Sequence, residues 1–160
     1  MFLLTIAVCL ADTTSSRSSI KNTAESLDEL VSAEKKRKMI IHENGHQREI
    51  RIKPLDPTIF APKISSILEI DEDIITSAIR QKKVKVSDLV FAQILSNTAG
   101  DSLHENLEKR SYSSWLQELE RVGANLEQVQ KTFDDLYVEV SFVAMDARMQ
   151  QRLATTQRGR

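Results

Sequence analysis

The sequence predicts a mainly helical α+β domain, in which one N-terminal β-hairpin at about 39–53 packs on several helices and a long C-terminal helix follows. Three observations predict this fold. Aromatic residues are 5% of the 160 residues and glycines number four, which is typical of a helical domain and low for an all-β barrel. An Asn-Gly pair separates two stretches that read as strands. After residue 125, apolar residues recur in steps of three and four.

The composition also limits the classes of function. Lys and Arg number 22 and Asp and Glu 23, so the formal net charge of -1 produces no overall field toward nucleic acid or an anionic membrane. The single cysteine, Cys9, excludes an intrachain disulfide framework and a Cys-cluster zinc site. A chain of this length predicts one domain with one core.

The first eleven residues, 1–11, form an apolar N-terminus of the signal-peptide type. The apolar run from Phe2 to Ala11 is too short for a transmembrane helix, which takes about 20 residues. Ala11 suits a cleavage site, but the positively charged segment that normally precedes the apolar run is missing. A core-docked or amphipathic N-terminus and a misplaced start codon are the alternatives. The protein is expected to be exported if the run is a signal, and cytoplasmic if it is structural.

Composition changes mark the remaining boundaries. The Ser- and Thr-rich segment 12–23 has no apolar period and predicts a flexible linker. A single helical domain that includes the hairpin is expected over 24–155. A frayed basic tail is expected at 156–160. The first helix of the domain is expected to carry Leu27, Leu30 and Val31 on one side.

The stretch from Met39 to Leu55 has two incompatible interpretations. Residues 42–46, His-Glu-Asn-Gly-His, fit the H-E-x-x-H zinc motif, in which two histidines one helical turn apart bind the metal. Asn44-Gly45 instead predicts a hairpin, because a type I′ turn needs positive φ at both central residues. A helix would also place Gly45 inside it, at a cost of about 1 kcal/mol relative to Ala. We therefore predict a hairpin, with no metal, no cofactor and no catalytic residue, whose shared face carries Met39, Ile41, Ile50 and Ile52.

Several short helices are expected after the hairpin. Asp71 is a suitable N-cap for a helix that ends near Gln81, and Ser87 for one that ends before Gly100. Two shorter helices are predicted at 101–110 and 114–122.

The residues present argue against nucleic-acid binding. The helix after Ser87 offers Asp88, Leu89, Val90 and Phe91 where a helix-turn-helix protein needs polar side chains that reach base edges. The basic run at 35–38 has no interleaved aromatic residues, so a solvated helix end is the preferred interpretation.

The long C-terminal helix carries the candidate partner-binding residues. Their heptad-like spacing suits either a coiled coil or a helix that lies across a domain core. Further apolar residues at Tyr137, Val138, Phe142 and Met145 widen the stripe, which favours core packing or contact on two sides. We predict a protein partner or self-association through Leu126, Val129, Phe133, Leu136, Val140 and Val143.

The predicted Asn44-Gly45 turn and the phrase EIRIKPL at 49–55 precede a series of expected short helices and a long helix. In this pattern, which covers roughly Met39 to Leu153, the chain resembles the small tail assembly chaperones of tailed phages. The resemblance implies a short β element before a helical body that binds the tape measure or tail tube protein during assembly. The apolar N-terminus departs from that family, whose members are cytoplasmic.

The predicted function is therefore that of a non-enzymatic protein-binding or assembly module. No small-molecule substrate is inferred. The first alternative is an exported small helical protein of an envelope or virion, which would bind by the same apolar face. A third group comprises an enzyme with an unrecognised site and a helix-turn-helix DNA binder. The carboxylates at 71–73 and 134–135 are not paired with a nucleophile or base at any recognisable spacing.

Overall fold

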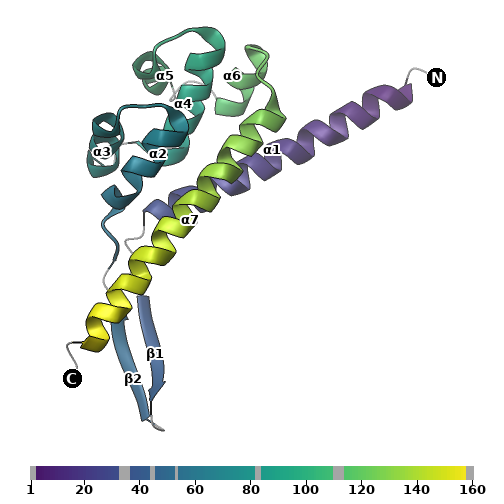
Figure 1. The fold of residues 1–160 in the computed structure, drawn as a ribbon. Coiled ribbons are helices and arrows are strands. Elements are labelled where there is room, and N and C mark those ends of the chain that lie inside the picture. Colours follow the sequence, from purple (N-terminus) through teal and green to yellow (C-terminus); the bar gives the residue numbers. More distant parts are fainter. Residues whose placement is uncertain are drawn as a thin grey trace.

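Two long helices, α1 (Leu3–Val31) and α7 (Leu126–Gln157), lie side by side and run in the same general direction (Figure 1). The computed structural model describes residues 3–32, 37–43, 46–52, 54–81, 84–109 and 114–157. The described residues are mainly helical, which confirms the coarse fold prediction. None of the described helices is both long and apolar enough to cross a membrane.

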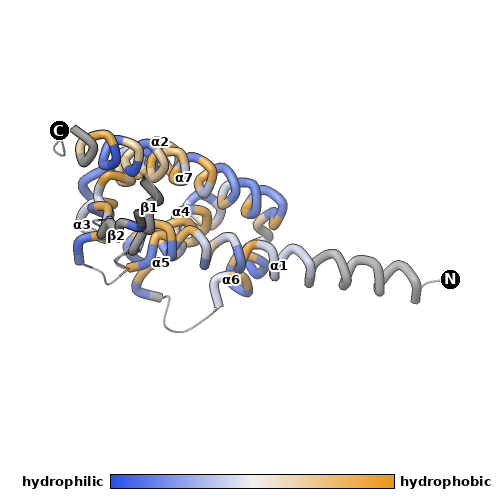
Figure 2. The backbone as a smooth tube through the Cα atoms, turned by 90° about the horizontal axis from the view of Figure 1, so that it is seen from below, coloured by the Kyte–Doolittle hydropathy of each residue, from blue (hydrophilic) through white to orange (hydrophobic). Residues whose placement is uncertain are grey.

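Short elements fill the chain between the two long helices. Most of them lie along one side of α7, while hydrophobic residues occur at intervals along α7 itself (Figure 2). Their bounds are β1 (Arg37–Glu43), β2 (His46–Ile52), the 3-10 helix η1 (Pro57–Phe60), α2 (Ala61–Leu68), α3 (Glu72–Gln81), α4 (Val86–Ala99), α5 (Leu103–Lys109) and α6 (Trp115–Arg121).

Helix α1 corrects the linker prediction for 12–23. Buried side chains follow each other along it in steps of four, three and four residues, at Ile20, Ala24, Leu27 and Val31. The apolar period therefore begins one turn before the predicted domain boundary, inside the Ser- and Thr-rich segment. Such a segment becomes helical because packing of one face, rather than propensity, supplies most of the stability of a helix in a protein.

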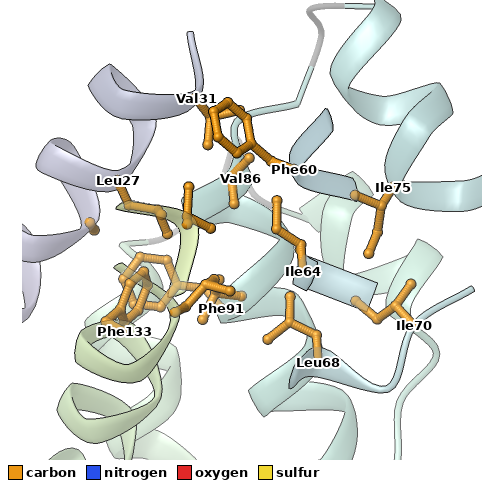
Figure 3. Close-up of a cluster of buried hydrophobic side chains, with 14 of the residues drawn as sticks. Leu27, Val31, Phe60, Ile64, Leu68, Ile70, Ile75, Val86, Phe91 and Phe133 are labelled. Carbon is orange, nitrogen blue, oxygen red and sulfur yellow. The ribbon is translucent and has the colours of Figure 1, made fainter. Parts of the chain in front are cut away.

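The core lies where α1, α4 and α7 meet the short helices α2 and α3. Leu27 and Val31 of α1 face Phe60, Val86 and the aromatic residues of α4 and α7 (Figure 3). The largest fully buried side chains are Phe60, Phe133, Ile20, Leu27, Ile64, Ile75, Leu89, Leu119 and Leu136, followed by Val90, Val129 and Val140.

The ends of the short helices follow local chemistry. Asp71, the predicted N-cap of α3, accepts a hydrogen bond from the Asp73 N–H at 2.9 Å, as an N-cap residue is expected to do. Helix α4 ends before Gly100, whose left-handed φ of 81° suits glycine and whose N–H donates to the Ser96 carbonyl. Ser87 was expected to cap α4, but α4 begins at Val86 and Ser87 is buried in its first turn.

Strands β1 and β2 pair antiparallel, with Met39 opposite Ile50, Ile41 opposite Arg48 and Glu43 opposite His46. Asn44, Gly45 and most side chains of the strands lie outside the described residues. The turn type, the shared apolar face and the packing of the hairpin on the helices therefore stay predictions.

Candidate protein-binding face

Helix α7 carries two apolar faces. The first, here called the inner face, comprises Val129, Phe133, Leu136, Val140 and Ala144, all buried. The second, here called the outer stripe, comprises Val138, Phe142, Met145, Met149 and Leu153, all exposed. Each set repeats in steps of three and four residues, so each follows one side of a helix with 3.6 residues per turn.

The inner face holds most of the residues that were predicted to bind a partner. Val129, Phe133, Leu136 and Val140 are at most 1% exposed. Leu126 and Val143 are partly buried and pack against the same core. Helix α1 lies along this face, so the chain itself supplies the partner helix. This is a correction: the six predicted residues belong to the core, and any partner surface on α7 lies elsewhere.

The outer stripe is the main concentration of exposed apolar side chains in the described residues. Of seven large exposed hydrophobic residues, six lie on α7: the outer stripe and Tyr137. The seventh, Ile74, is on α3. Phe142 is 58% exposed and Met145 is 60% exposed. Single exposed apolar residues are common on soluble proteins, but a contiguous set marks an interaction surface.

Polar contacts fix α7 on the core. Asp134 accepts hydrogen bonds from the Gln130 side chain at 2.6 Å and from the Thr23 hydroxyl of α1 at 3.3 Å. Lys63 of α2 forms an ion pair with Glu139 at 3.1 Å. Near the middle of α1, Arg17 forms an ion pair with Glu120 of α6. The outer stripe is thus presented by a helix that is held in place on its other side.

A half-buried carboxylate joins α1 to the start of α4. Asp28 accepts hydrogen bonds from the Ser87 N–H at 2.9 Å and from the Ser87 hydroxyl at 2.6 Å. Burial raises the pKa of the Asp28 carboxyl above its ordinary value, while the two hydrogen bonds from Ser87 act in the opposite direction. Asp28 therefore caps α4 from a distant part of the chain. The sequence signal for it is an acidic residue beside Leu27 in the apolar stripe of α1.

Aromatic side chains join α4 and α6 to the inner face of α7. The Trp115 indole N–H donates to Asp88 at 2.8 Å, and its ring stacks on Phe91 with centroids 5.9 Å apart. Phe91 in turn lies against Phe133, with centroids 4.8 Å apart. Asp88 in the first turn of α4 and Phe91 in the second are engaged in these contacts, which favours packing over insertion into a DNA groove.

The described residues contain no group of three or more His, Cys, Asp or Glu side chains that could hold a metal ion. His104 lies 3.2 Å from Glu108, one turn along the exposed side of α5. The side chains of His42 and His46 lie outside the described residues. Comparisons with known protein families, with curated proteins and with solved structures found no match to this chain.

Proposed function

We propose that this chain is a non-enzymatic protein-binding or assembly module, and that it binds its partner through the outer stripe of α7. The observation that carries the proposal is the row of five exposed apolar side chains from Val138 to Leu153. Exposure of such a row to water is unfavourable, because full burial of each Val, Leu, Phe or Met side chain stabilises a protein or complex by about 1.5–3 kcal/mol.

The chemistry of the stripe indicates the kind of partner. An apolar row along one side of a helix fits the apolar face of a second helix or a hydrophobic groove. Met145 and Met149 add adaptable, polarisable contact area around Phe142. A partner of this kind would be a protein, since the stripe offers neither a charged pocket for a small anion nor a stacking platform for bases.

An assembly chaperone of the phage-tail type is the specific form of this function that the sequence resemblance suggests. In that form, a β element precedes a helical body that holds an apolar protein segment until it is assembled. The outer stripe would be the surface that holds it. The support for this form is the EIRIKPL phrase together with the helical body that follows it.

For the hairpin we propose a strand-turn-strand with no zinc and no catalytic role. The support is that His42 lies in β1 and His46 in β2, whereas the H-E-x-x-H motif needs one continuous helix. Metal analysis of the purified protein tests this proposal. One zinc per chain that is lost in His42→Ala would contradict it.

Photo-crosslinking tests the binding face. A photoreactive phenylalanine analogue at Phe142 is expected to give protein adducts in the cells that naturally make the protein. The matched control carries the analogue at Asn97, an exposed residue of α4 outside the stripe. Equal adduct yields at the two positions, or none at Phe142, would exclude the outer stripe as the binding face.

A further inference from the structure

We propose that the partner that covers the outer stripe is a second copy of this chain, with the two α7 helices packed antiparallel. This inference rests on the proposed function and names its partner. It is carried by two features of α7, namely the distribution of charge along the helix and the spacing of the stripe.

Charge changes sign along α7 at the middle of the outer stripe. Between residues 134 and 146 the chain has four acidic residues and no basic one: Asp134, Asp135, Glu139 and Asp146. Glu139 is paired with Lys63 of α2, so the other three supply the negative charge of this half. Between residues 147 and 157, where α7 ends, it has two basic residues and no acidic one: Arg148 and Arg152. The stripe itself, from Val138 to Leu153, spans both halves.

This distribution selects the antiparallel direction for two identical helices. In a parallel pair, each acidic half would lie beside the acidic half of the other copy, and each basic half beside a basic half. In an antiparallel pair, every acidic half lies beside a basic half. At physiological salt, screening acts over about 8 Å, so neighbouring halves of packed helices still interact. Like charges are also the usual device by which an interface rejects a wrong arrangement.

The spacing of the stripe fits the same arrangement. A twofold axis that crosses the helix pair between Met145 and Asp146 brings Val138 level with Leu153 of the other copy, and Phe142 level with Met149. Met145 then lies close to its own counterpart. A twofold interface uses the same surface on both copies, so each contact occurs twice. The stripe is about 23 Å long at 1.5 Å per residue, a small interface for which we expect a weak dimer.

Disulfide crosslinking tests the direction of the pair. Cys9 is first replaced by Ser, so that each variant has one cysteine. Met145→Cys lies next to the proposed axis and is expected to give a disulfide-linked dimer under mild oxidation. Val138→Cys alone is expected to give none above background, because its two copies would lie about 22 Å apart along the helices. An equal mixture of Val138→Cys and Leu153→Cys is expected to give the mixed dimer.

Asn97→Cys, on α4 and outside the stripe, sets the background rate of random collision. A Val138→Cys dimer that forms as fast as the Met145→Cys dimer would overturn the antiparallel arrangement. Met145→Cys at the background rate would overturn self-association. If Phe142 then still gives adducts with another protein, the proposed function stands without this inference, and if it gives none, both fall.

Discussion

The inner face and the outer stripe of α7 are made of similar residues at similar spacing, yet they have opposite environments. Phe133 is fully buried and Phe142, nine residues later, is 58% exposed. The difference lies in α1, which covers one face and leaves the other in water. The comparison teaches that hydrophobic periodicity identifies the faces of a helix that are available for packing, while only the rest of the fold decides which of them the chain itself covers.

The largest effect is expected from a charge on the inner face. Phe133→Asp would bury a carboxylate between α1 and α4 and remove a large core side chain, a change expected to cost about 4 kcal/mol or more. We expect loss of the cooperative unfolding transition in chemical denaturation. Unchanged stability in this variant would show that the inner face is not the core of the protein in solution.

A smaller effect is expected from the loss of the polar contact between Asp28 of α1 and Ser87 of α4. Asp28→Ala would leave the buried N–H and hydroxyl of Ser87 without their acceptor and is expected to cost about 1–2 kcal/mol. Asp28→Asn keeps an acceptor for the Ser87 N–H and is expected to cost less. Denaturant titrations of the three proteins at neutral pH provide the comparison.

The Asp28 carboxyl should also make the free energy of unfolding depend on pH. The folded-state pKa of Asp28 is raised above its ordinary value of 3.8, so its contribution to stability is fully present below that value and is lost as the pH rises through the folded-state pKa. The free energy of unfolding of the unmodified protein should therefore rise relative to that of the Asp28→Asn variant as the pH falls from neutral toward 4. A difference that stays constant over this range would mean that the Asp28 carboxyl is not desolvated in the folded protein.

The smallest effect on stability is expected on the outer stripe. Phe142→Asp places a charge in water and should change the free energy of unfolding by no more than about 0.5 kcal/mol. The same substitution should abolish association, since it puts two carboxylates near the centre of the proposed interface. Light scattering over a range of concentrations measures this directly. Destabilisation as large as that of Phe133→Asp would erase the distinction between the two faces.

The sequence predicted the parts of the fold that depend on local chemistry. The Asp71 cap of α3, the stop of α4 before Gly100 and the apolar rows of α7 all follow from residues within a few positions of each other. The predictions that were wrong concern features that depend on distant residues. The linker at 12–23 is helical because its far end packs on α7, and the cap of α4 comes from Asp28, fifty-nine residues before Ser87.

The predicted partner site failed for a related physical reason. The sequence contains an apolar stripe from Leu126 to Val143, and further apolar residues such as Phe142 widen this stripe. Nothing local distinguishes the row that α1 covers from the row that stays in water. The sequence therefore signals the outer stripe only by containing more apolar residues in this helix than one buried face requires.

The pairing of α1 with α7 also sets the order in which this chain can fold. Thr23 and Asp134, which are hydrogen bonded across the two helices, are 111 residues apart in the sequence. Contacts between such distant residues slow folding, because a long loop must close before they form. During synthesis the apolar side of α1 leaves the ribosome long before α7 exists to cover it. We therefore expect the apolar side of α1 to be exposed to water in the nascent chain until α7 has been made. The chain should be most prone to aggregation during this period.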